Sequence, residues 1–238
     1  MPILGPPPLQ TELSAILFFG RTLDEYARFF ALDLVALRRQ AVLDVAAGPS
    51  SFTSEASRRG IDAVAVDPMY GRSAHYLGAQ VRQDYGRIFA QIRAKPRFFR
   101  LKAFPSPAMA EADHRLAAQW FLTDYEGNAR HGRYARGALP LLPFLDEAFD
   151  LVLCAHLLFI HAALFDYSWH LAACVELVRV SGGEARIHPV CGIDGRLYAE
   201  LERLQRELFA RGVHSAVVPV DYEFFTGSNN MLVLTRHR

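Results

Sequence analysis

The chain has 238 residues, of which 51% are hydrophobic and 21% charged, as in an ordinary globular protein with one sizeable core. Lysine and arginine number 26 against 25 aspartate and glutamate, so no basic surplus favours a nucleic-acid partner. The three cysteines are widely spaced, which predicts reduced thiols in a cytoplasmic protein and no metal site. The N-terminus, MPILGPPPLQ, lacks the pattern of a secretion signal, and no apolar run is long enough to predict a membrane span.

The N-terminal part of the chain is expected to be helical. Apolar residues recur at helical intervals from Leu13 to Leu34, with a break at 19–22, Phe-Gly-Arg-Thr. Thr22 is expected to cap the second helix, because Glu25 follows three residues later and completes a capping box.

The next part predicts a strand, a tight turn, a helix and a second strand. A short apolar run at 41–45 leads into the sequence D-V-A-A-G-P-S-S at 44–51, which is typical of a strand followed by a turn. A helix is expected from Phe52 to Arg59, ended by Gly60, and a strand at 63–66 closes with Asp67. This order is that of a parallel βαβ unit.

Residues 71–132 interrupt the alternation with two predicted helices, at 76–92 and 108–122. After them we expect strands at 134–139, 149–154 and 184–189, helices at 171–178 and 195–211, and a terminal hairpin with strands at 216–220 and 230–235. The chain therefore reads as a single domain, 1–238, that carries a helical insertion at 71–132.

Two features predict a nucleotide-type cofactor. Small residues at Ala46, Gly48 and Ser50 let the backbone approach a ligand where the first strand turns into its helix. Asp67 follows Gly48 by 19 residues, close to the spacing of about 20 at which an acid binds ribose hydroxyls. A plain turn residue is the alternative for Asp67. Ala46 replaces the first glycine of G-x-G-x-x-G, which weakens the case for a pyrophosphate ligand.

Several stretches resemble the class I S-adenosylmethionine-dependent methyltransferases of the small-molecule type. They are V-L-D-V-A-A-G-P-S-S-F-T at 42–53, V-A-V-D at 64–67, L-P-F-L-D-E-A-F-D-L-V-L-C at 142–154 and E-L-V-R-V-S-G-G-E at 176–184. The resemblance covers 41–67 and 137–190 well, and 71–132 hardly at all. It implies an α/β fold with a Rossmann-like, mostly parallel seven-stranded sheet, an antiparallel C-terminal hairpin, and the insertion between the second and third strands.

The resemblance also implies S-adenosylmethionine as cofactor. The residues that it assigns to the methionine moiety, the ribose and the adenine, in that order along the chain, are Asp44, Ala46, Ala47, Gly48, Pro49, Ser50, Asp67, Pro68, Met69, Ala138 and Leu139. Arg21 is a candidate partner for the methionine carboxylate, with a surface arginine as the alternative. Relatives often have an acidic residue near 137 that contacts the adenine amine, whereas this chain has Arg-Gly-Ala at 136–138.

Methyl transfer depends mainly on positioning, and a general base helps only when the acceptor must lose a proton. His156 is the favoured base because it follows a central strand, although a histidine hydrogen-bonded within the packing fits equally. His161, Asp166, His170 and His188 are further candidates, and a structural role is favoured for His161 and His170.

The predicted function is methyl transfer to a small or medium organic acceptor. The chain lacks the Asn/Asp-Pro-Pro-Tyr/Phe tetrapeptide used on base amines. The alternatives are an NAD(P)-dependent oxidoreductase on the same scaffold and a non-catalytic cofactor-binding module. Residues 71–132 are expected to cover the site and choose the acceptor, or else to pack on the flank or against a second subunit of a homodimer.

Overall fold

The computed structural model describes residues 16–237, which form a seven-stranded sheet in the order β3-β2-β1-β4-β5-β7-β6. The strands are β1 (Ala41–Val45), β2 (Asp62–Asp67), β3 (Tyr134–Arg136), β4 (Phe149–Ala155), β5 (Ser181–His188), β6 (Val213–Pro219) and β7 (Asn230–Arg236). Strands β1 to β5 pair in parallel, and β7 runs antiparallel to β5 and β6. The predicted fold class is confirmed, including the antiparallel hairpin and the position of the insertion.

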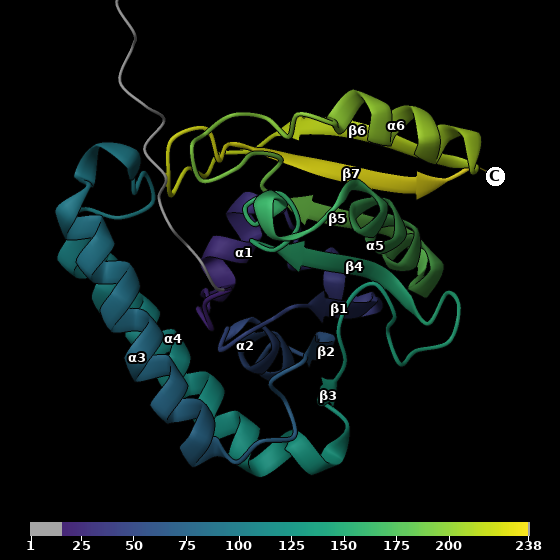
Figure 1. The fold of residues 1–238 in the computed structure, drawn as a ribbon. Helices are drawn as coiled ribbons and strands as arrows, with labels where there is room; N and C mark the ends of the chain where they lie inside the picture. The colour runs from purple at the N-terminus through teal and green to yellow at the C-terminus, as the bar shows by residue number, and fades with distance from the viewer. Residues whose placement is uncertain (1–15, 238) are drawn as a thin grey trace, which may run out of the picture.

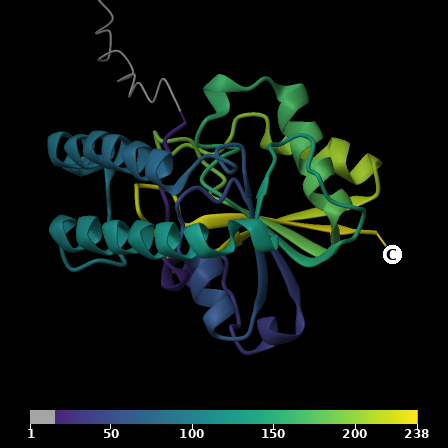
Figure 2. The ribbon, with the colours of Figure 1, turned by 90° about the horizontal axis from the view of Figure 1, so that it is seen from below.

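The helices are α1 (Leu23–Phe29), α2 (Phe52–Arg58), α3 (Ala74–Ala94), α4 (Pro107–Asn128), α5 (Tyr167–Val180) and α6 (Leu201–Ala210). Figure 2 shows α1 and α2 on one face of the sheet and α5 and α6 on the other. Central strands such as β1 and β4 are therefore largely buried on both faces, which explains why most of their residues are apolar. None of the helices within 16–237 is long and apolar enough to cross a membrane.

The chain before α1 differs from the prediction. Thr22 caps α1 in the expected capping box with Glu25. Residues 16–21, however, are not helical, and residues 1–15, which include the start of the predicted helix, lie outside the described part. The backbone N–H of Phe18 donates to Asp84, and that of Gly20 donates to the Tyr85 hydroxyl. These donors therefore serve contacts with α3 rather than a helix of their own.

The helix predicted at 195–211 begins only at Leu201. Gly195 has a φ of +78°, and its N–H donates to the Gly192 carbonyl in a turn. The N–H of Tyr198 donates to the Val190 carbonyl, which holds this turn against the end of β5. Leucine spacing extended the predicted helix too far because it does not register the left-handed glycine.

The insertion consists of α3 and α4, a long pair of helices that pack side by side. Figure 1 shows them beyond the sheet edge toward which the β4 and β5 arrows point. The pair therefore lies near the carboxyl ends of the parallel strands, where open α/β sheets bind their ligands.

Candidate functional site

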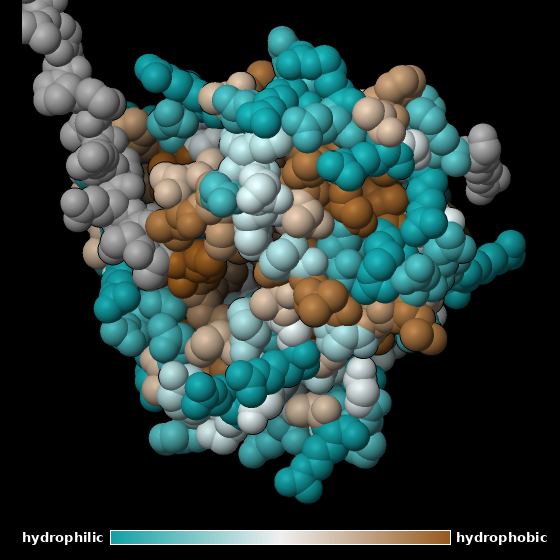
Figure 3. All heavy atoms as spheres, turned by 45° about the vertical axis from the view of Figure 1, so that its right-hand side comes forward, coloured by the Kyte–Doolittle hydropathy of each residue, from teal (hydrophilic) through white to brown (hydrophobic). Residues whose placement is uncertain are grey.

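A cavity of about 520 Å³ lies at the carboxyl ends of four neighbouring parallel strands. It occupies the point where the chain, after building β1, β2 and β3 on one side, continues to β4 on the other side of β1, the usual ligand position in such sheets. The segments that follow these strands supply Val45, Ala46, Gly48, Asp67, Pro68, Met69, Gly137, Ala138, Leu139, Ala155, His156 and Leu157 to its wall. Figure 3 shows apolar side chains gathered around a hollow on one face of the molecule.

The two features on which the cofactor prediction depends are in direct contact. The N–H of Gly48 donates to Asp67 Oδ2 at 3.0 Å, and the N–H of Met69 donates to Oδ1 at 2.8 Å. Burial raises the pKa of Asp67 to about 6, against the opposing effect of these two hydrogen bonds. An ionised carboxylate accepts about four hydrogen bonds, so Asp67 retains capacity for a ligand in the cavity.

The backbone donors of the turn at 47–51 are already in use. Ala47 donates to the Val66 carbonyl, Ser50 to the Ala47 carbonyl and Ser51 to the Arg21 carbonyl, while Gly48 donates to Asp67 and Pro49 has no N–H. The chain at Gly20 also presses on the turn, since a Cβ there would lie 2.2 Å from the Pro49 carbonyl. A pyrophosphate needs such N–H groups free, so this turn is not built for one.

Asp44 lies beneath the turn rather than in the cavity wall. Its two carboxylate oxygens each lie 3.0 Å from the Tyr26 hydroxyl, and burial raises its pKa well above the ordinary range. Ser50 Oγ accepts the N–H of Arg21 at 3.0 Å. Five of the predicted cofactor residues lie outside the wall of this cavity: Arg21, and four that support the turn, namely Asp44, Ala47, Pro49 and Ser50.

Helix α3 contributes to the cavity, although residues 71–132 showed no motif. Tyr76, Gln80 and Asp84 line the wall. Asp84 Oδ2 accepts the N–H of Phe18 at 2.9 Å and the Gln80 amide at 2.8 Å. Asp84 thereby holds the segment before α1, including Phe19, against the cavity. Only tertiary structure reveals this contact, because the partners are 66 residues apart.

His156 has the geometry expected of a functional residue. It has a φ of +54°, and its N–H donates to the His188 carbonyl at 2.6 Å. Neither ring nitrogen has a hydrogen-bond partner although both are buried. Burial, followed by the charge of Arg21, lowers its pKa well below the usual range, so the ring is neutral at pH 7. Its positive φ and its two unpartnered ring nitrogens make His156 a candidate functional residue.

The three other candidate histidines differ in whether they line a cavity. His170 Nδ1 lies 2.7 Å from the Asp166 carbonyl and its Nε2 lies 3.1 Å from the Leu158 carbonyl, so the ring is held within the packing. His188 Nε2 donates to the Ser228 carbonyl at 2.9 Å. His161 lines a second cavity beside the first.

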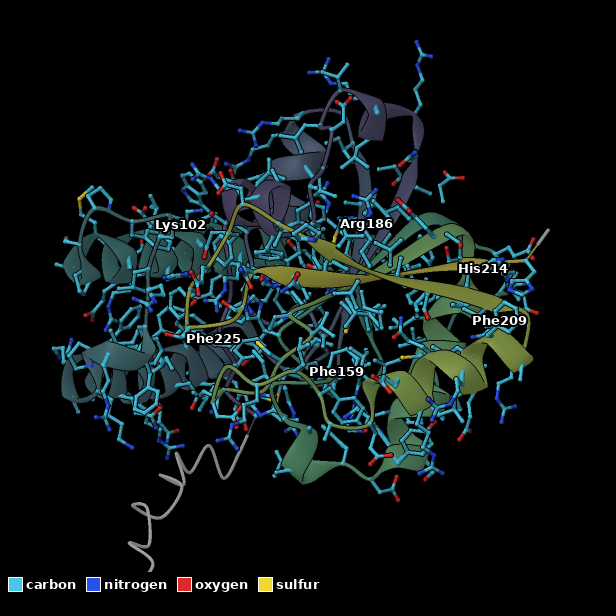
Figure 4. All side chains as sticks on the ribbon, turned by 90° about the horizontal axis from the view of Figure 1, so that it is seen from above. Lys102, Phe159, Arg186, Phe209, His214 and Phe225 are labelled. Carbon is cyan, nitrogen blue, oxygen red and sulfur yellow. The ribbon has the colours of Figure 1, made fainter. Side chains whose placement is uncertain are left out.

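This smaller cavity, of about 80 Å³, also contains the side chain of Arg21. It shares Leu17, Phe19 and His156 with the larger cavity. Arg21 is only 5% exposed, so it is not a surface arginine, and it does not line the larger cavity where the methionine carboxylate was expected. Figure 4 shows Phe225, which also lines the smaller cavity, on the side of the sheet nearest the insertion.

A protein of Methanocaldococcus jannaschii described as uncharacterized is 27% identical over 226 residues, which cover 94% of this chain and 98% of that protein. No protein-family model matches the chain.

Three solved structures that resemble this chain are described as methyltransferases. A TehB-like SAM-dependent methyltransferase from Corynebacterium glutamicum is 16% identical over 85% of each chain, with a TM-score of 0.45. A SAM-dependent methyltransferase from Aquifex aeolicus is 15% identical over 90% of this chain and 95% of that one, with a TM-score of 0.41. Magnesium protoporphyrin IX methyltransferase from Synechocystis with bound SAM is 11% identical over 90% of each chain, with a TM-score of 0.45. At such identities and scores, the activity of this chain has to be inferred from its own site.

Proposed function

We propose that this protein is an S-adenosylmethionine-dependent methyltransferase that acts on a small or medium organic acceptor. The observation that carries the proposal is the contact of the Gly48 N–H with Asp67, beside a cavity of about 520 Å³ at the carboxyl edge of the sheet. When bound, the cofactor supplies a sulfonium methyl group, which the acceptor takes while the sulfur keeps the electron pair of the broken bond.

The cavity suits an adenosyl sulfonium in shape and in charge. We assign the ribose hydroxyls to Asp67, the adenine to the apolar wall around Met69 and Leu139, and the methionine end to the part of the wall beside Ala46 and Gly48. Pro68 and Ala138 complete the wall on the adenine side. The only charged side chains among its described lining residues are the carboxylates of Asp67 and Asp84, which favour a cationic ligand.

The oxidoreductase alternative receives less support from the same site. A dinucleotide would bring a pyrophosphate to a turn whose N–H groups are occupied and whose cavity carries two carboxylates. A non-catalytic module remains a separate hypothesis, and detection of a methylated product decides it.

His156 is our candidate for the general base. It borders both cavities, and its neutral ring has two nitrogens without partners, so one of them can accept the proton that an acceptor loses. The site also has to exclude water, and we assign this role to α3 and to the segment held by Asp84, which both line the cavity. Since Ile88 and Phe99 of the insertion line the smaller cavity, we propose that residues 71–132 take part in choosing the acceptor.

Calorimetry with four ligands tests the cofactor. We expect S-adenosylmethionine and S-adenosylhomocysteine to bind and NAD⁺ and NADP⁺ not to bind. Asp67→Ala should weaken S-adenosylhomocysteine binding about tenfold or more, because it removes one to two hydrogen bonds to the ribose. Asp62→Ala, at an exposed position of the same strand, is the matched control and should bind like the wild type. Equal affinity of the Asp67 variant and the wild type would contradict the assignment.

A further inference from the structure

The smaller cavity has an apolar wall that contains a single charged side chain. Among the described residues that line it, Arg21 is the only charged one, and His156 and His161 are the other polar ones. Burial lowers the pKa of His161 to about 4, so this ring is neutral at pH 7. A cavity with these walls and one cation suits a molecule that is apolar over most of its surface and carries one anionic group.

Arg21 retains an unused donor. Its guanidinium lies 4.7 Å from the ring centre of Phe19 and 4.4 Å from that of Phe224, and its side chain is 7% exposed. Nε has no hydrogen-bond partner. A buried donor without a partner is costly, and a ligand oxygen in the cavity would remove that cost.

The nearest carboxylate does not satisfy this donor. Glu25 forms an ion pair with Arg21, but its Oε1 lies 3.7 Å from Nε, beyond hydrogen-bond distance. Oε1 accepts the Tyr222 hydroxyl at 2.6 Å and faces His114 Nε2 at 3.0 Å, and the same His114 nitrogen lies 3.2 Å from Nη1 of Arg21. Glu25 Oε2 accepts the N–H of Thr22 at 2.9 Å. Burial alone would raise the pKa of Glu25, but His114, Arg21 and Tyr222 lower it to about 2, so it stays ionised and committed to these partners.

The dimensions indicate how a ligand would lie. A volume of about 80 Å³ is several times the roughly 10–15 Å³ of such space that holds one water molecule, enough for a carboxylate and part of a ring. The rest of the molecule would lie against His156, which lines both cavities. Phe99, Phe224 and Phe225 offer aromatic surfaces against which a planar ring can pack.

We propose that the smaller cavity is the acceptor subsite and that the acceptor is a small aromatic carboxylate. Its carboxylate binds Arg21 Nε, and its hydroxyl or amino group lies toward His156. This inference rests on the methyl-transfer function proposed above and adds the chemical class of the acceptor.

The test compares matched aromatic probes by calorimetry on the full chain saturated with S-adenosylhomocysteine. The probes are 4-hydroxybenzoate and 6-hydroxy-2-naphthoate, each with its neutral amide as control. We expect at least one carboxylate to bind about tenfold or more tightly than its amide, since a hydrogen bond between two charged groups is stronger than a neutral one. R21Q, which removes the charge together with the Nε donor, should reduce this ratio to below about threefold while S-adenosylhomocysteine affinity is kept.

A second variant separates the loss of the Arg21 donor from general damage to the cavity. F99A removes an aromatic part of the wall and leaves the Arg21 guanidinium in place, so it should weaken the carboxylate and its amide equally and leave their ratio unchanged. Equal binding of carboxylates and amides to the wild type, or no binding of either series, would overturn the acceptor proposal and leave the cofactor proposal standing. If S-adenosylhomocysteine itself does not bind, the proposed function fails, and the same titration of the free protein still decides whether Arg21 holds a carboxylate.

Discussion

The two cavities are built in different ways. More than half of the residues that line the larger one follow the ends of four strands, so these residues occur at regular places in the sequence. The smaller one is formed by large side chains from separate parts of the chain, among them Arg21, Phe99, His161, Ile193 and Phe224. The difference teaches that a site for a common cofactor can be found from turn and spacing patterns, whereas a site for a particular acceptor is an assembly of distant side chains.

The largest expected effect is on the rate of methyl transfer and concerns His156, which lines both cavities. H156Q should lower the rate of methyl transfer about 100-fold or more, because glutamine cannot accept the proton. Affinity for S-adenosylhomocysteine should stay within about threefold of the wild type. The control is H131Q, at an exposed position, which should change neither quantity. The rate is measured with an acceptor that the wild type methylates. An unchanged rate in H156Q would show that His156 does not act as a general base.

The second effect concerns the close approach of Gly20 to the turn at 47–51, which borders the larger cavity. G20A places a Cβ 2.2 Å from the Pro49 carbonyl. Because the clashing atoms of Pro49 belong to the backbone, the turn itself has to move to relieve the clash. We expect a loss of about 2 kcal/mol or more in the free energy of unfolding, measured with denaturant, together with weaker cofactor binding.

G86A is the matched control for that substitution. Gly86 is an exposed helical position where an added Cβ meets nothing within 4 Å. Alanine there should stabilise the protein by about 1 kcal/mol, since it favours the helix over glycine. Equal stability of the G20A variant and the wild type would mean that the segment before α1 does not press on the turn in solution.

The smallest effect is a pH dependence confined to the larger cavity. The pKa of Asp67 is raised to about 6, so lowering the pH through 6 protonates a group that should accept hydrogen bonds from the ribose. Affinity for S-adenosylhomocysteine should then fall several-fold, while D67N should show a flat profile. The stability of the free protein should respond in the opposite sense: because the folded state binds this proton more tightly than the unfolded state, the contribution of Asp67 is lost as the pH rises through about 6. Parallel loss of affinity in D67N would attribute the effect to another group.

Much of the fold could be predicted, because strand and turn signals are local. The run at 41–45, the glycine turn and Asp67 lie within one βαβ unit, and the structure brings Gly48 and Asp67 into contact as the spacing predicts. The hydrogen-bond partner of Asp44, by contrast, could not be predicted from the local sequence. A carboxylate in a buried strand has to be satisfied by some partner, and the sequence does not reveal that the Tyr26 hydroxyl supplies it.

The candidate site was harder to predict where contacts join distant segments. Arg21 was expected beside the methionine moiety, yet its side chain lines the smaller cavity between Phe19 and Phe224, about 200 residues apart in the sequence. Asp84 on α3 gave no signal, since an acid in a long amphipathic helix usually faces solvent. Local patterns cannot register such contacts, because burial and hydrogen bonding depend on which helix packs on which strand.

The central claim is that the larger cavity holds an adenosyl sulfonium with its ribose at Asp67. The most direct test is a crystal structure of the protein with S-adenosylhomocysteine. The account predicts the ribose hydroxyls within hydrogen-bond distance of Asp67 and the adenine against Met69 and Leu139. Ligand density elsewhere on the molecule, or an empty cavity beside Asp67 at saturating ligand, would contradict it.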